Sequence, residues 1–238
     1  WQTSKSLAEH TLRVTSQNYL AHTQLANAWL EEGNLAEALR QCELALTIRP
    51  TYAEAHNVRA NILFRQQKWE QARQAFEQAI QCNPTFPDSW HGLACVLLEQ
   101  GQWNEAAQAA QRALELWPLH LGAWFTLARA HHQAGQYKAA QAAYQRLLQF
   151  KPDSVAALQG LGATLAMQGQ TEAAVQAYEQ AWRLRPDDLE VQLRLGVLRF
   201  QAGQLEAAER HLQTVLEANP DQPLAQVHLG HIQLARGD

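Results

Sequence analysis

Small and apolar residues recur along this chain at a fixed distance of 34 residues. Inside each period the apolar positions return after three or four residues, and polar residues stand between them, which is typical of amphipathic helices. One column of small residues marks the period: Ala38, Ala72, Ala106, Ala140, Ala174 and Ala208. A second column stands four residues later: Cys42, Phe76, Ala110, Tyr144, Tyr178 and Leu212. The pattern predicts a repeated helical unit with close helix contacts at the small residues.

Turn residues follow the same period and predict where the helices end. The prolines of one column are Pro50, Pro84, Pro118, Pro152, Pro186 and Pro220. The glycines of another are Gly33, Gly101, Gly135, Gly169, Gly203 and Gly237, with Gln67 in the one remaining position. The residue after a helix often needs a positive φ, which glycine adopts freely, and proline cannot continue the helical hydrogen-bond ladder. The third period therefore predicts one helix over about 88–100 and a second over 103–116.

The arrangement resembles the tetratricopeptide repeat, a 34-residue pair of helices with Trp, Leu-Gly, Tyr, Ala, Phe and Pro at set positions. The third period carries Trp90, Leu93, Ala94, Leu97, Ala106, Ala110 and Pro118 at these positions. The fourth carries Trp124, Leu127, Ala128, His131, Ala140, Tyr144 and Pro152, and the next two supply Leu161-Gly162 and Leu195-Gly196. The resemblance covers the whole chain. It implies an all-α fold, a right-handed α-solenoid of about fourteen helices in which each unit contacts mainly its neighbours.

The phase divides the chain into six full units and two partial ones. Residues 1–18 are expected to form the second helix of a partial repeat, since Trp1 stands two periods before Trp69. Residues 223–238 are expected to form the first helix of a partial seventh repeat. The full units are 19–52, 53–86, 87–120, 121–154, 155–188 and 189–222. Because the chain starts at Trp1 and not at Met, we expect it to be part of a longer protein or to be processed.

Composition narrows the classes of partner. The chain is 47% hydrophobic and 18% charged, a composition typical of ordered proteins. Its net charge is −4 and the sequence shows no basic stripe, which argues against a nucleic-acid-binding protein. The three cysteines, Cys42, Cys82 and Cys95, are spaced too irregularly for a disulfide framework or a zinc module. No apolar run is long enough to span a bilayer, so we expect this part of the chain not to be inserted in a membrane. The localisation stays open.

In the tetratricopeptide family, ligands lie in the concave groove lined by the first helices, and the resemblance implies the same here. The groove columns are polar and amide-rich in the first half of the chain and mostly apolar in the second. Paired amides such as Asn57 and Asn61 suit a peptide backbone, and the apolar half suits an aliphatic or aromatic side chain or an amphipathic helix. The candidate peptide-binding residues are Asn27, Asn57, Asn61, Arg65, His91, Arg129, His132, Met167, Leu193, Val197 and Phe200. The alternative is that the apolar strip is ordinary core, or is covered by another part of the same protein.

Other chemistry finds little support in the sequence. His91, Cys95 and Glu99 are spaced four residues apart, so we expect them on the same face of a helix. A structural zinc site has four ligands, and we therefore interpret these three as groove residues. No Ser or Cys nucleophile matches a base and an orienting acid, and no Gly-rich loop follows a strand. We therefore predict neither a catalytic site nor a metal or cofactor site.

Three hypotheses for the function follow. The first is a non-catalytic scaffold that binds a peptide or protein segment in the groove. The second rests on residues 1–22, which resemble the junction after the membrane part of bacterial glycosyltransferase-like proteins with tetratricopeptide tails. That resemblance implies a substrate-docking or assembly tail of a membrane-anchored glycosyltransferase. The third is self-association through the ends of the repeat array.

Overall fold

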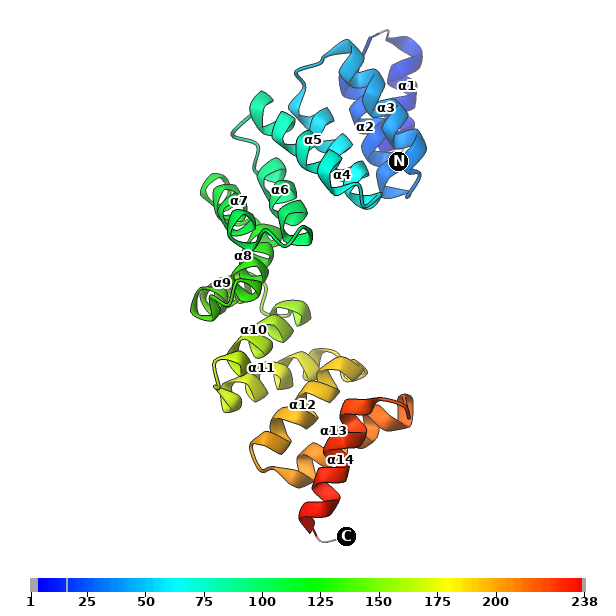
Figure 1. The fold of residues 1–238 in the computed structure, drawn as a ribbon. Helices are drawn as coiled ribbons and strands as arrows, with labels where there is room; N and C mark the ends of the chain where they lie inside the picture. The colour runs from blue at the N-terminus through cyan, green and yellow to red at the C-terminus, as the bar shows by residue number, and fades with distance from the viewer. Residues whose placement is uncertain (1–3, 16, 237–238) are drawn as a thin grey trace. The chain divides into compact units, whose positions relative to one another are not determined.

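The computed structural model describes residues 4–15 and 17–236, and these residues form fourteen helices and no strand. Figure 1 shows the helices in chain order. The all-α fold predicted from the sequence is confirmed. Trp1 and Gly237, which the periodic pattern places in its columns, lie outside the described residues.

The helices alternate between two sets. After α1 (Ser4–Val14), the first set starts a new helix every 34 residues: α2 (Tyr19–Glu31), α4 (Ala53–Arg65), α6 (Pro87–Glu99), α8 (Leu121–Gln133), α10 (Val155–Met167), α12 (Leu189–Gln201) and α14 (Pro223–Arg236). The second set has the same spacing: α3 (Leu35–Ile48), α5 (Trp69–Cys82), α7 (Trp103–Leu116), α9 (Tyr137–Phe150), α11 (Thr171–Leu184) and α13 (Leu205–Ala218). Of the pair expected at about 88–100 and 103–116, the first helix begins and ends one residue early and the second has the predicted bounds. The limits of the repeat units themselves stay a prediction.

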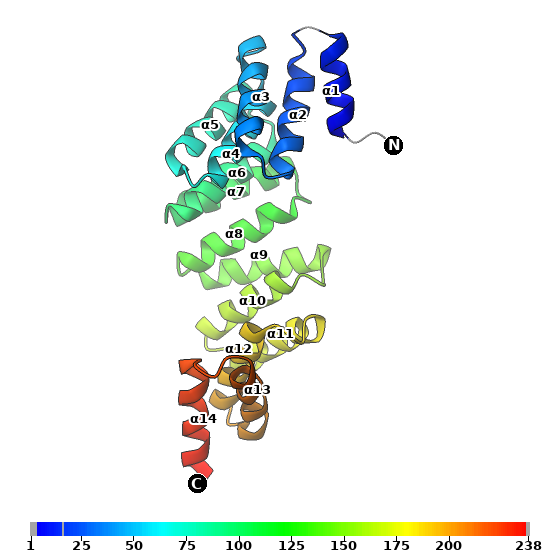
Figure 2. The same ribbon diagram turned by 90° about the vertical axis from the view of Figure 1, so that its right-hand side faces the viewer.

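The chain divides into two compact units, Trp1–Ala130 and His131–Asp238, which we call the first and second unit. In the first unit α2 packs against α3, α4 against α5 and α6 against α7, and successive first-set helices also touch. In the second unit α10 packs against α11, α12 against α13 and α14 against both α12 and α13. Figure 2 shows the same helices turned by 90°. Each unit is therefore built from paired helices that bury their apolar faces on their neighbours.

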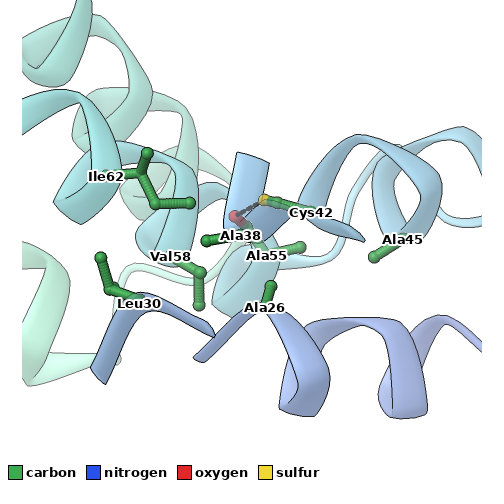
Figure 3. Packing of buried hydrophobic residues seen from close by; sticks show 8 residues of the cluster. All are labelled: Ala26, Leu30, Ala38, Cys42, Ala45, Ala55, Val58 and Ile62. Atoms are coloured by element: carbon green, nitrogen blue, oxygen red, sulfur yellow. Dashed lines mark hydrogen bonds between the residues drawn. The ribbon is translucent and has the colours of Figure 1, made fainter. Parts of the chain in front are cut away.

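The core of the first unit shows why the small-residue column exists. Figure 3 shows Ala38 of α3 close to Ala55 of α4, with larger side chains such as Ile62 beside them. Both alanines have no exposed surface. The Cys42 thiol donates a hydrogen bond to the Ala55 carbonyl oxygen at 3.0 Å, so its polar hydrogen is satisfied inside the core. A larger side chain in this column would hold the helices apart.

The turns between paired helices use the predicted positive φ. The glycine column has φ between 71° and 80° at Gly33, Gly101, Gly135, Gly169 and Gly203. Gln67 occupies the equivalent turn with φ of 59°. There the Lys68 amide donates to the Leu63 carbonyl oxygen at 3.0 Å and closes the end of α4. The hydrogen-bond pattern is kept, but a side chain with a Cβ is held in the left-handed region.

Replacing Gln67 by glycine is expected to raise the free energy of unfolding by about 0.5–1 kcal/mol. The gain comes from relieving the Cβ strain and is reduced by the greater freedom of glycine in the unfolded chain. Urea denaturation followed by far-UV circular dichroism measures it. Gly101→Ala is the matched control, with an expected loss of similar size, and a loss in both variants would contradict the assignment.

Candidate functional site

A cavity of about 640 Å³ opens in the second unit between α10, α11 and α12, with the last turn of α8 at its edge. In both views of the fold, α10, α11 and α12 are neighbours (Figures 1 and 2). We call this cavity the α10–α12 groove. Its apolar lining is Ala163, Ala166, Met167, Val197 and Leu198. Met167 is 59% exposed, although methionine is a residue that proteins usually bury.

The polar lining lies around this apolar floor. It consists of His132, Gln159, Tyr178, Glu190, Arg194 and Gln201. The Arg194 Nε donates to Glu190 Oε1 at 2.7 Å, and about half of each side chain is exposed, so the pair adds little to stability. Gln159 Nε2 donates to Asp188 Oδ2 at 3.0 Å. The groove therefore combines an apolar surface with a rim that can contact a polar backbone.

The protonation state of His132 follows from its neighbours. Thr164 is fully buried, and its hydroxyl donates to the Gly160 carbonyl oxygen at 2.7 Å. Because that hydroxyl has one hydrogen, it can only accept from His132 Nδ1, which lies 2.9 Å away. Burial lowers the pKa of His132, which favours the neutral ring. His132 is thus the Nδ1–H tautomer, and its Nε2 is a hydrogen-bond acceptor.

Tyr178 reaches the groove from a second-set helix because a glycine of α10 leaves room, and a second glycine does the same for Tyr144. A Cβ on Gly162 would lie 2.6 Å from the Tyr178 ring, and one on Gly160 would lie 2.3 Å from Cζ of Tyr144. Both rings can therefore pack directly on the α10 backbone. Burial raises the pKa of Tyr178 to about 12, so the phenol stays protonated.

A smaller cavity of about 300 Å³ lies in the first unit between α4, α5 and α6. Its lining includes three predicted residues, Asn57, Asn61 and His91. Asn57 Oδ1 accepts from the Ser89 hydroxyl at 3.2 Å, and Asn61 Nδ2 donates to the Asn57 carbonyl oxygen at 3.0 Å. These amides are therefore partly occupied by the protein itself.

His91 belongs to a compact polar cluster beside the smaller cavity. Its Nε2 lies 3.2 Å from Thr126 Oγ1 and 3.4 Å from Cys95 Sγ, and its ring centroid is 4.5 Å from that of His120. His120 Nε2 in turn lies 3.2 Å from Asp88 Oδ1. Burial, and then the neighbouring His120, lower the pKa of His91 to about 4.

The Cys95 thiol in this cluster is not activated, because burial raises its pKa. Among residues 4–15 and 17–236, no three or more His, Cys, Asp or Glu side chains are grouped to hold a metal ion.

Three predicted residues of the first unit lie elsewhere. Asn27 lines a separate hollow of about 310 Å³ with Leu7 of α1. Arg65 donates from Nη1 to the Leu30 carbonyl oxygen at 2.6 Å. Arg129 lies 4.0 Å from the Glu99 carboxylate. None of the three lines the two cavities described above.

The four predicted residues of the apolar half of the groove also lie in different places. Met167 and Val197 line the α10–α12 groove. Leu193 is only 5% exposed and packs in the core with Leu212. Phe200 packs on the rings of His228 and His231, at centroid distances of 5.1 and 6.0 Å, and does not line the groove. The groove as predicted thus includes residues that the core of the second unit uses.

Nine groove residues were missing from the predicted set: Gln159, Gly160, Ala163, Ala166, Tyr178, Glu190, Arg194, Leu198 and Gln201. Gly160 and Arg194 are 34 residues apart and occupy the same position of the repeat, and Arg194 directly follows the predicted Leu193, so the period itself could have indicated them. Tyr178 carried no such signal, because its column is a packing column of the second-set helices.

The sequence model of the tetratricopeptide repeat matches residues 97–165 and 165–229, more than half of the chain. The chain belongs to the tetratricopeptide-repeat family. Further models of the same repeat match residues 75–108, 53–86 and 20–43. Membership confirms the predicted all-α solenoid class and supports a role as a scaffold for protein–protein interaction.

Solved structures with the same fold include three that span most of the chain. PilF of Pseudomonas aeruginosa has a TM-score of 0.80 at 17% identity and covers 96% of this chain and 100% of its own. PilW, a type IV pilus biogenesis factor, has a TM-score of 0.79 at 22% identity, with 90% and 100% covered. YrrB, a repeat protein with an unusual peptide-binding site, has a TM-score of 0.65 at 20% identity, with 85% and 100% covered. At these identities the likeness shows the fold alone.

No curated protein matches the chain. The resemblance of residues 1–22 to glycosyltransferase-like proteins stays a prediction. Within the part of the chain that the structure describes, no helix has the length and apolar character that crossing a bilayer requires.

Proposed function

We propose that this repeat protein is a non-catalytic scaffold that binds a peptide or protein segment in the α10–α12 groove. The observation that carries the proposal is the exposed Met167 at the edge of a 640 Å³ cavity with an apolar floor and a polar rim. Ligand sites in proteins commonly combine these two features, because apolar area supplies affinity and a few polar groups fix orientation. YrrB shows that a protein of this fold carries a peptide-binding site.

The flexible thioether of methionine supports the same proposal. A methionine adapts to differently shaped side chains and is over-used on binding surfaces. In this groove it stands next to Ala163 and Ala166, whose small side chains leave the cavity open. A segment that buries this surface would gain roughly 25 cal/mol for each Å² of apolar area removed from water.

Selection of peptides from a displayed random library tests the proposal. Peptides captured by the protein are expected to bind the Met167→Glu variant at least tenfold more weakly, because an unpaired carboxylate would be desolvated in the groove. Leu184→Glu is the matched control, since Leu184 is 47% exposed on α11 and does not line the groove. Equal binding by wild type and Met167→Glu would overturn the proposal.

Self-association remains the second candidate. Leu224, Val227 and Leu234 are exposed on α14. Static light scattering over a range of protein concentrations tests it, since an associating array would show a rising mean mass.

A further inference from the structure

We propose that the α10–α12 groove recognises a tryptophan side chain of its partner segment, with the indole N–H donating to Nε2 of His132. The inference rests on the proposed function of this groove and adds the chemical class of the side chain that it selects. It is carried by the hydrogen-bond network around His132 and by the walls of the cavity.

The network fixes what His132 offers to a ligand. Its Nδ1 is used by Thr164, whose own hydrogen is used by the Gly160 carbonyl oxygen. His132 nevertheless lines the cavity, and the polar atom that it has left is Nε2. Because Nδ1 carries the proton of the neutral ring, Nε2 can accept and cannot donate. A ligand buried here must therefore bring a donor.

The walls of the cavity determine the size and the apolar character of that ligand. Apolar surface from Ala163, Ala166, Met167 and Val197 calls for a large apolar body. The Met167 thioether would contact an aromatic ring favourably, and the cavity of about 640 Å³ has room for a two-ring side chain. The side chain that fits this cavity is thus large and aromatic and carries a hydrogen-bond donor.

Tryptophan meets these conditions with one group. Its indole is a donor without an acceptor, which matches Nε2, whereas the tyrosine hydroxyl brings an acceptor that His132 cannot satisfy. Phenylalanine would fill the apolar part but leave Nε2 desolvated and without a partner, which costs binding free energy. Specificity here would come from the cost of burying an unpaired acceptor.

The test uses the peptides selected on the full chain, each prepared with tryptophan or with benzothienylalanine, an analogue of the same shape whose sulfur replaces the N–H. For the wild type, the tryptophan peptide is expected to bind about five- to tenfold more tightly than the analogue, as for one buried hydrogen bond. For His132→Leu, the ratio is expected to fall to about one, since the acceptor is gone. Circular dichroism checks that this variant keeps its helices.

The outcomes separate the two proposals. Peptides that depend on Met167 but show no enrichment in tryptophan would overturn the inference and leave the proposed function standing. A tryptophan-to-analogue ratio near one in the wild type, or a ratio unchanged in His132→Leu, would do the same. Capture that does not depend on Met167 would overturn the proposed function and the inference with it.

Discussion

Replacing Phe76 by alanine is expected to lower the free energy of unfolding of the first unit by about 4 kcal/mol. Phe76 is a large side chain with only 1% of its surface exposed. It packs on the α6 backbone at Gly92, where a Cβ would lie 2.2 Å from its ring. Phe-to-Ala changes at such sites cost about 3–5 kcal/mol, because apolar burial is lost and a cavity remains. Urea denaturation followed by far-UV circular dichroism measures the loss.

Phe150→Ala is the matched control for this measurement. Phe150 ends α9 in the second unit, is 36% exposed and lies under the Arg146 guanidinium at 4.8 Å. Its removal is expected to cost about 1 kcal/mol or less, since most surface substitutions do. A loss for Phe76→Ala no larger than that for Phe150→Ala would show that α5 and α6 do not depend on this contact.

Acidification from pH 7 to pH 4 is expected to destabilise the first unit by about 3 kcal/mol through His91 alone. Its pKa in the folded protein is about 4, against an unfolded value of 6.5. Between these values the unfolded chain binds the proton and the folded protein does not, so stability falls as the pH falls. The drop of about 2.5 pKa units corresponds to about 3 kcal/mol at 1.36 kcal/mol for each unit.

The groups that face His91 make the direction clear. They are His120, Asp88, Cys95, Thr126 and the Gly122 backbone, which like Asp88 favours the protonated ring. The Asp88 carboxylate favours the protonated ring, but burial and the neighbouring His120 outweigh it. His120 holds the pKa of Asp88 below its usual range, which adds a further loss of stability only at still lower pH.

The His91→Gln variant isolates this contribution, because glutamine has no titrating group and keeps an amide near Thr126. Denaturation midpoints of both proteins are measured at several pH values between 7 and 4. The difference between wild type and variant is expected to change progressively over this window. Parallel curves for the two proteins would mean that His91 titrates with its ordinary pKa.

The fold could be predicted from the sequence almost completely, because each structural position of a repeat occurs several times in the chain. The Ala38 and Gly33 columns each recur at nearly every period, so a single deviation such as Gln67 did not obscure them. The structure places Gln67 at positive φ, as its glycine-type turn requires. Because of the repetition, both the turn positions and the fold class could be predicted from the sequence.

The groove could be predicted only in part, because a repeat position does not determine how deep a side chain is buried. Leu193 and Val197 are four residues apart on α12, yet Leu193 lies in the core and Val197 lines the groove. Tyr178 lines it because Gly162 lets a second-set helix come close. Such contacts depend on the sizes of side chains on neighbouring helices, which no single column records.

The central claim, that a peptide segment occupies the α10–α12 groove, has a direct probe in Met167, the single methionine of the chain. Protein labelled with ¹³C at the methionine methyl group is titrated with the tightest selected peptide, and Met167→Leu identifies the signal. Occupancy of the groove predicts that this methyl resonance shifts to a new, saturating position with the affinity seen by fluorescence anisotropy. A resonance that stays in place while the peptide binds would contradict the assignment of the site.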